Sequence, residues 1–191
     1  MSTARIYVDE VVEQDSHRSF GHELISGVRA GQVAGLAMAG ALMALSGVFL
    51  NKGLFYPLEV IAASVFGESA IGRLDVPTLV VGLLVHQFGP ALAWGVVFGI
   101  VVWLFKPRRS VALMMWGILV GAIAQIVDVH ILLPLLSGDL SGRLPFFGPL
   151  QHENLWAQHI PVVASWLGHL VFGLSLSLYP WRYDPAAGSF D

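Results

Sequence analysis

The chain has 191 residues, of which 55% are hydrophobic and only 12% are charged, and its mean hydropathy is +0.71. A soluble domain carries about 25% charged residues, so the composition indicates an integral membrane protein. The net charge of −3, without a concentrated basic face, excludes a nucleic-acid-binding protein. The absence of cysteine excludes disulfides, thiolate nucleophiles, iron–sulfur clusters and cysteine zinc sites.

Residues 1–26 carry charges of both signs and lack an apolar core, so they are predicted to form a cytoplasmic N-terminal segment and not a signal peptide. Four apolar runs follow, each long enough to cross a hydrocarbon core of about 30 Å, which takes about 20 helical residues. They predict an all-α fold: an integral membrane four-helix bundle over residues 27–180, followed by a cytoplasmic tail at 181–191. The predicted spans are residues 27–50, 77–105, 110–136 and 155–180.

The first outer loop, residues 51–76, contains an apolar segment, LEVIAASVF, that is too short to cross the membrane. Pro57 suits the first turn of a helix, and Phe55 and Tyr56 suit the level of the lipid headgroups. The loop is therefore predicted to hold an interfacial or re-entrant helix.

The basic sequence KPRR at residues 106–109 predicts the orientation of the chain. Basic residues gather on the cytoplasmic side, which places this short turn in the cytoplasm and, by alternation, both termini there as well. The predicted location is the inner (plasma) membrane of a bacterium, with several passes.

Small residues recur at every fourth position of the predicted helices. In lipid, such residues let two helix backbones approach closely. The partner of these faces, another helix of this chain or another subunit, is left open by the spacing. The predicted helix-packing residues are Gly27, Gly31, Gly35 and Ala39 on the first helix, and Gly117 and Gly121 on the third.

Polar side chains lie within the predicted spans, where an ionisable group costs at least about 2.5–3.5 kcal/mol and needs a partner. Gln125 and Asp128 continue the small-residue face of the third helix, whereas His130 lies about 200° around that helix, near its outer end. Counted at about 1.5 Å per residue, Asp128 and His86 lie about 12–13 Å deep and His169 about 21 Å deep. The predicted intramembrane polar cluster is His86, Gln125, Asp128, Ser165 and His169.

Three interpretations of this cluster stay open. The first is an interhelical hydrogen bond that fixes helix register, with Asp128 bonded to His86 or His169. The second is a proton path or a quinone site, because an Asp–His pair in a membrane can titrate near neutral pH. The third is a b-type haem or a His/Asp metal site, with His86, His159 and His130 as candidate cofactor ligands. No catalytic residue or resident metal is predicted, and a chain without a cofactor is the leading expectation.

The segment GLFYPLEVIAAS, residues 53–64, follows a first helix rich in Gly, Ala and Met. It resembles small, functionally uncharacterised bacterial four-span membrane proteins, which carry an aromatic-Tyr-Pro turn and an Ile-Ala-Ala run after the first span. The resemblance covers about the first half of the chain. It implies the four-helix topology and the outer interfacial segment, and it implies no activity.

The sequence contains no P-loop, G-x-S-x-G, H-E-x-x-H or dinucleotide-binding motif. Its small size and close-packing faces predict a non-catalytic accessory subunit within a larger bacterial membrane complex, respiratory or electron-transfer in kind. The expected partners are other membrane protein subunits and the lipid bilayer, and the oligomeric state is open. The alternatives are a b-type haem or quinone-binding redox protein that uses the outer histidines, and a proton or small-solute conduit along Asp128, Gln125 and His169.

Overall fold

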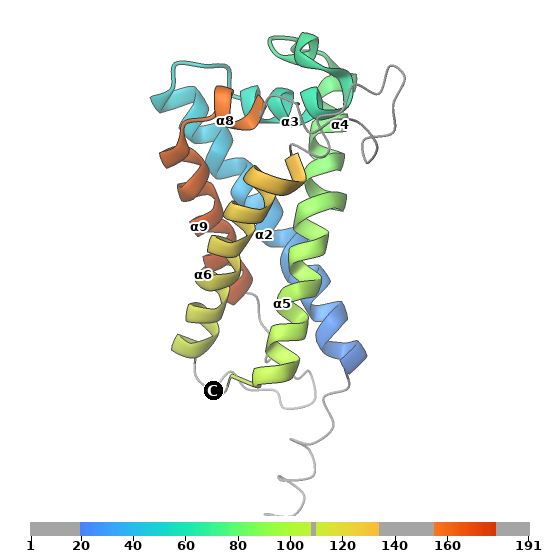
Figure 1. Cartoon of the computed structure of the whole chain (residues 1–191), viewed down its shortest axis with the longest axis vertical. Coiled ribbons are helices and arrows are strands. Elements are labelled where there is room, and N and C mark those ends of the chain that lie inside the picture. Colours follow the sequence, from blue (N-terminus) through green and yellow to red (C-terminus); the bar gives the residue numbers. More distant parts are fainter. Residues whose placement is uncertain (1–19, 108–109, 134–154, 179–191) are drawn as a thin grey trace, which may run out of the picture.

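The computed structural model describes residues 20–107, 110–133 and 155–178, and within these residues the protein is all-helical and has no strand. Long helices run side by side, and short helices lie across one end of them (Figure 1). Three apolar helices are long enough to cross a membrane: Phe20–Phe49, Val76–Phe105 and Ser110–Leu132. The predictions for residues 1–19, 134–136 and 179–191 lie outside the described residues.

The first long helix, α2 (Phe20–Phe49), begins before the predicted start of the span at residue 27. Glu23 is buried in its first turns. A Cβ added to Gly99 would lie 2.6 Å from the Glu23 carbonyl oxygen, so close packing against a neighbouring helix continues past this charged residue. Tertiary contact therefore extends the helix beyond the apolar run that the sequence analysis used.

The second long helix contains a wide turn at its middle. It consists of α4 (Val76–His86), a π-helical segment η2 (Gln87–Ala91) and α5 (Leu92–Phe105). Pro90 lies inside η2, where a proline ring has no N–H to donate and clashes with the preceding turn. The Gln32 side chain of α2 donates a hydrogen bond of 2.9 Å to the Gln87 carbonyl oxygen, so a neighbouring helix satisfies the disturbed backbone.

The third long helix also contains a π-helical segment, near its end. It comprises α6 (Ser110–Val127) and η3 (Asp128–Leu132). It follows α5 through a short turn in which Lys106 adopts a left-handed conformation with φ of 42°. The end of the molecule where α5 leads into α6 is called the turn end below.

The predicted fourth span, residues 155–180, is not one continuous helix. The structure has a short helix α8 (Leu155–His159) and a separate helix α9 (Val162–Leu178), with Pro161 at the break. The residue before a proline is disfavoured in helical conformation, and the proline itself lacks the N–H that would continue the helix. The prediction of a single helix from residue 155 is therefore wrong, although the proline was visible in the sequence.

The first outer loop forms the predicted short helix, α3 (Tyr56–Phe66), with Pro57 in its first turn. A 3-10 turn, η1 (Glu68–Ala70), follows it. The buried Glu59 carboxylate accepts a hydrogen bond of 2.8 Å from the Gly72 N–H, which ties the chain after η1 back to α3. Helices α3 and α8 lie across the end of the bundle opposite the turn end (Figure 1), and α3, η1 and α8 are called the cap below.

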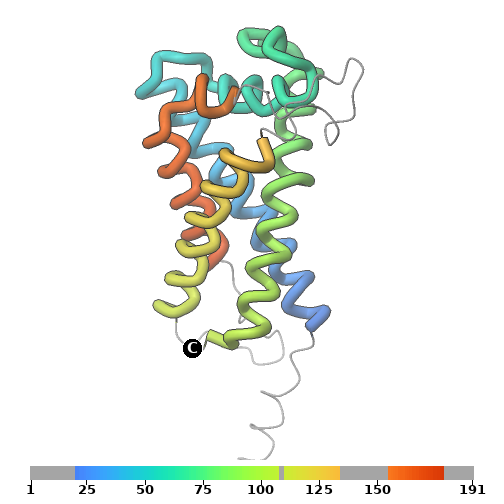
Figure 2. The backbone as a smooth tube through the Cα atoms, viewed as in Figure 1, coloured from blue at the N-terminus to red at the C-terminus, as the bar shows by residue number. Residues whose placement is uncertain are grey.

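The small-residue faces pack against each other within this chain. Helix α2 runs beside α5, and α6 runs beside α9 (Figure 2). A Cβ added to Gly31 would lie 2.6 Å from the Gly95 Cα, and one added to Gly121 would lie 3.1 Å from the Gly173 Cα. The same holds at Gly27, Gly35 and Gly117, and Ala39 is buried beside them. The partner that the spacing left open is thus another helix of the same chain.

Candidate functional site

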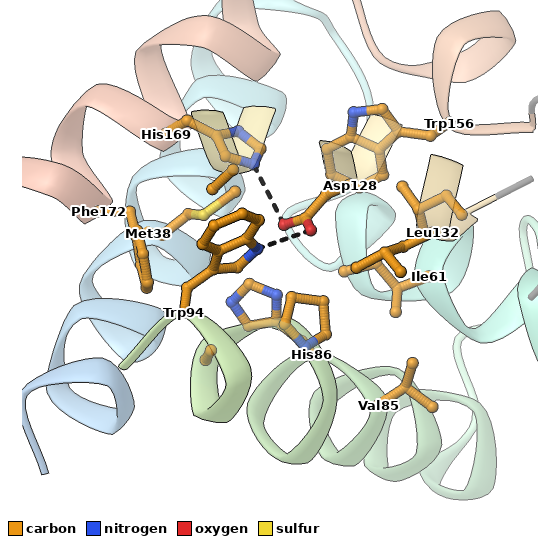
Figure 3. Close-up of a pocket in the computed structure, with 14 residues that line it drawn as sticks. Met38, Ile61, Val85, His86, Trp94, Asp128, Leu132, Trp156, His169 and Phe172 are labelled. Atoms are coloured by element: carbon orange, nitrogen blue, oxygen red, sulfur yellow. Dashed lines mark hydrogen bonds and ion pairs between the residues drawn. The ribbon is translucent and has the colours of Figure 1, made fainter. Parts of the chain in front are cut away.

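Asp128 is a buried carboxyl group at the centre of the bundle, at the first position of η3. Its Oδ1 accepts a hydrogen bond of 2.8 Å from the Trp94 indole N–H of α5. Its Oδ2 lies 3.7 Å from Nε2 of His169 on α9, whose side chain is 4% exposed. Figure 3 shows the carboxylate between these two rings. Asp128 therefore joins three separate helices.

The hydrogen bonds of His169 assign its tautomer. Its Nδ1 lies 2.9 Å from the Ser165 carbonyl oxygen, which only accepts hydrogen bonds, so Nδ1 carries a hydrogen. In a neutral ring the remaining nitrogen, Nε2, then has a lone pair, and this lone pair faces the Asp128 carboxyl group. A proton on either Asp128 or His169 relieves that conflict, as a carboxylic acid or as an imidazolium beside a carboxylate. The 3.7 Å contact is therefore an ion pair when His169 also carries a proton on Nε2, as an imidazolium beside the carboxylate.

Ser165 connects this pair to two further polar groups. Its hydroxyl donates a hydrogen bond of 2.7 Å to the Gln125 side-chain oxygen and accepts one of 2.9 Å from the Trp156 indole N–H. All three side chains are buried. Ser165 thus fixes Gln125 of α6 and Trp156 of α8 relative to α9.

His86 is buried in the same region. Its hydrogen-bond partner is the backbone of α2, and not Asp128, which the sequence analysis gave as one alternative. Its Nε2 lies 3.0 Å from the Gly35 carbonyl oxygen, so Nε2 carries a hydrogen and the imidazole holds α4 against α2. The interhelical ion pair of Asp128 is formed with His169, and His86 stands across the cavity from it.

A cavity of about 40 Å³ lies between these side chains. Its lining includes His86, Trp94, Asp128 and His169 together with Trp156 (Figure 3). A water molecule needs about 10–15 Å³ of such volume, so the cavity has room for a few waters. Sites for drug-sized ligands are about 300–1,000 Å³, which makes this cavity too small for a haem or a quinone ring.

Both π-helical segments lie at this site. Asp128 is the first residue of η3, and His86 directly precedes η2. A π turn costs regular helical hydrogen bonding and occurs frequently at functional sites. Two helices have a π turn next to a buried ionisable group, His86 in one and Asp128 in the other. This coincidence makes the region the candidate functional site within the described part of the chain.

The three candidate cofactor ligands of the sequence analysis are not brought together. His86 lies inside the bundle, His159 lies in the cap, and His130 is exposed on η3. Nδ1 of His159 lies 2.8 Å from the Tyr56 hydroxyl, and its Nε2 lies 3.9 Å from Glu68. Among the described residues, no group of three His, Asp or Glu side chains is arranged to hold a metal ion. In the described part of the chain these three histidines therefore have separate surroundings and do not converge on one site.

The Tyr56 hydroxyl stays protonated in this environment. Burial, and then the nearby Glu59 carboxylate, raise the pKa of Tyr56 above its ordinary value of 10.0. The hydroxyl and the His159 ring therefore form a hydrogen bond that links α3 to α8 across the cap.

Two tryptophans of the site were not identified from the sequence. Trp94 is four residues beyond Pro90 and eight beyond His86, a spacing that places it close to the same side of a helix as these two residues. Trp156 is expected at the membrane interface from its residue type, but it is buried with its N–H bonded to Ser165.

Comparison of the chain with protein-family models, with curated proteins and with solved structures found no match. The function is therefore argued from the geometry of the site.

Proposed function

We propose that this protein is a bacterial inner-membrane protein with four spans that takes up and releases a proton at the buried Asp128–His169 pair. The observation that carries the proposal is the 3.7 Å separation of Asp128 Oδ2 and His169 Nε2, with the other ring nitrogen already committed to a carbonyl oxygen. Adding or removing one proton changes the net charge of this buried pair, in which Asp128 and His169 are only 6% and 4% exposed. Ionisable groups inside membrane spans are expensive, which is why they mark proton sites and relays.

The four-span topology rests on the arrangement of α9. Its 17 residues extend about 26 Å at 1.5 Å per residue, close to the hydrocarbon thickness of about 30 Å, and it packs between α2 and α6. Helix α2 starts near the turn end, and α9 runs from the cap toward that end (Figure 1). The basic turn supports a cytoplasmic location for that end and for both termini. The cap then occupies the outer interface, with α3 as the interfacial helix.

The accessory-subunit hypothesis rested on small size, the absence of a catalytic motif and close-packing faces. The last of these grounds is weakened, because Gly27 and Gly31 contact the backbone of Gly95 and Gly99 in the same chain. The redox alternative needs convergent histidines, whereas His86 and His159 are bonded to different partners, the Gly35 carbonyl oxygen and the Tyr56 hydroxyl. Both stay predictions, and the proton site is the function that the geometry favours.

Infrared difference spectroscopy between pH values, on the protein in lipid nanodiscs, tests the proposal. We expect the wild-type protein to show a carboxyl C=O signal that Asp128→Asn removes, because this variant keeps the shape of the side chain without its titration. His169→Gln should shift the pH at which that signal changes. Asp75→Asn is the matched control, since Asp75 is a solvated carboxyl at the start of α4.

Identical difference spectra for wild type and Asp128→Asn between about pH 4 and pH 9, the range that covers ordinary carboxyl and histidine titration, would contradict the proposal. If partner subunits co-purify stoichiometrically with a protein that shows no such signal, the accessory-subunit hypothesis is favoured instead.

A further inference from the structure

We infer that the Asp128–His169 pair exchanges protons with one side of the membrane only, the side at the cap, and that the Trp156 indole closes the way in. The inference rests on the proposed function for its proton, but its geometric content stands on the cavity, the cap and the packing of the turn end. It distinguishes a one-sided proton site from a conduit through the membrane.

The cavity at the pair extends to the cap. Ile61 of α3 and Trp156 of α8 line it together with Asp128, so cap and ion pair enclose the same space. In Figure 3 Trp156 lies beside Asp128 on the side where Leu132 and Ile61 are placed. Both Ile61 and Trp156 are buried, at 7% and 4% exposure, so they close the cavity and do not leave an open pore.

The bundle is closed between the pair and the turn end. Phe98 lies one turn beyond Trp94 along α5 and is fully buried, and Leu176 lies two turns beyond His169 along α9 and is also fully buried. Val120 fills the corresponding level of α6. Glycine contacts bring the backbones of α2 and α5, and of α6 and α9, together on either side of these residues. Packed side chains and touching backbones fill the interior at this level in the described part of the chain. The larger pocket that His169 also lines, with Ile118 and Ala122 of α6, lies among the exposed side chains Val162, Trp166 and Leu170 of α9, on the outer surface of the bundle.

The cap has the features of an element that opens locally. Helix α8 has five residues and ends at the break before Pro161, so its backbone is not continuous with α9. The side-chain hydrogen bonds that hold it include Trp156 to Ser165 and His159 to Tyr56. Short helical elements at the edge of a bundle open at lower free energy than the packed core of a protein. Displacement of α8 would move Trp156 away from the cavity and admit water to Asp128.

Thiol accessibility tests this inference cleanly, because the chain contains no cysteine. Ala124→Cys places a single thiol in the cavity wall, at a residue that is 1% exposed. Val120→Cys is the matched control, one turn nearer the turn end on the same helix and 3% exposed. Ser69→Cys and Lys106→Cys are reference thiols at exposed positions of the cap and of the turn end. A small, charged, membrane-impermeant methanethiosulfonate is added to sealed vesicles of either orientation.

We expect the Ala124→Cys thiol to react only in those vesicles in which the Ser69→Cys thiol reacts. The Val120→Cys thiol should react in neither orientation. Trp156→Ala should raise the reaction rate at Ala124→Cys by about tenfold or more, because it removes the side chain that closes the cavity. Ile61→Ala is a second variant with the same expected direction, in case Trp156→Ala fails to fold. Tyr56→Phe, which deletes only the hydroxyl bonded to His159, should give a smaller increase.

Reaction at Ala124→Cys from the side that labels Lys106→Cys would overturn the inference, as would the absence of reaction in wild-type, Trp156→Ala and Ile61→Ala backgrounds alike. A rate that both cap variants leave unchanged would overturn the role of the cap. The labelling does not depend on titration, so it can succeed while the infrared experiment fails. In that case the access route is real and the proposed proton site is wrong.

Discussion

Substitution of Gly31 by alanine tests whether backbone contact between α2 and α5 determines the stability of this protein. A Cβ at this position would lie 2.6 Å from the Gly95 Cα and would also collide with the Ala91 carbonyl oxygen. Carbon atoms in ordinary contact are about 3.5–4.0 Å apart, so the two helices would have to separate by about 0.9 Å. Both obstacles are backbone atoms, so no side-chain rotation relieves the overlap.

Gly40→Ala on the same helix is the matched control, since Gly40 is exposed and a Cβ there meets no atom within 4 Å. Each variant gains up to about 1 kcal/mol of helix propensity when glycine becomes alanine. Gly31→Ala additionally incurs the cost of overpacking, about 1–3 kcal/mol. We therefore expect Gly31→Ala to be about 1–3 kcal/mol less stable than Gly40→Ala, which is about 5–150-fold in the unfolding equilibrium constant.

The assay is unfolding of the purified protein in mixed micelles by increasing the fraction of sodium dodecyl sulfate, followed by circular dichroism. If the free energies of unfolding of the two variants agree within about 0.5 kcal/mol, the size of an ordinary surface effect, the close approach of α2 and α5 is not real. The reasoning about the glycine faces would then fail with it.

Three further substitutions have defined outcomes, the first two in the same assay and the third in thermal unfolding. Trp94→Phe removes the hydrogen bond to Asp128 and should lower the free energy of unfolding by about 1.5–3 kcal/mol if the carboxyl group is ionised. Ser165→Ala leaves a buried indole N–H and a buried amide oxygen without their partner, at about 1–3 kcal/mol for each group. Asp75→Ala should lower the midpoint of thermal unfolding, because the Asp75 side chain accepts the Thr78 N–H at the start of α4. Hydrogen bonds from Thr78 hold the pKa of Asp75 below its ordinary value of 3.8, so this contribution is fully present above that pH and is lost as the pH falls further.

Each of these substitutions has a control. Trp103→Phe changes a half-exposed indole on the same helix as Trp94, and a loss as large as that of Trp94→Phe would mean that ring size, and not the bond to Asp128, is measured. Ser177→Ala removes a hydroxyl that bonds within its own helix and should change stability by less than about 0.5 kcal/mol. Asp75→Asn keeps a capping oxygen without a titratable proton. Its thermal midpoint should vary less than that of the wild type below pH 3.8.

Hydropathy predicted the helical class and the positions of the three long apolar helices, because a bilayer imposes length and composition on any segment that crosses it. Spacing also predicted the inward face of the third helix, on which Gln125 and Asp128 are buried and from which His130 is absent. These features depend on residues near one another in the sequence, which is why one sequence suffices for them.

The depth of His169 was mispredicted because the break at Pro161 was overlooked. A single helix from residue 155 puts His169 about 21 Å below the outer end, too deep to lie level with Asp128. Counted from Val162, where α9 begins, it lies about 10 Å along that helix, and its Nε2 is 3.7 Å from the Asp128 carboxylate. The proline ends one helix and starts another, and so brings the two ionisable groups to the same level.

The partners of the polar groups were less predictable than their positions. That Trp94 donates to Asp128, and that Ser165 joins Trp156 to Gln125, depends on how four helices and the cap come together. Residue spacing along one helix gives the face on which a side chain lies, and it carries no information on which residue stands opposite. For the same reason the glycine faces alone left the choice between an internal and an external partner open.

The glycine contacts join the four long helices into two closely packed pairs. Backbones touch within the pair α2–α5 and within the pair α6–α9, whereas α2 meets α9 through the Leu42 side chain, which lies against Gly168. The hydrogen bond from Trp94 to Asp128 crosses from one pair to the other. Each pair can move as a rigid body, and the seam between them is bridged by side chains that can reorient. A change of charge at Asp128 therefore acts at the boundary between the two helix pairs, where the Trp94 hydrogen bond crosses from one pair to the other.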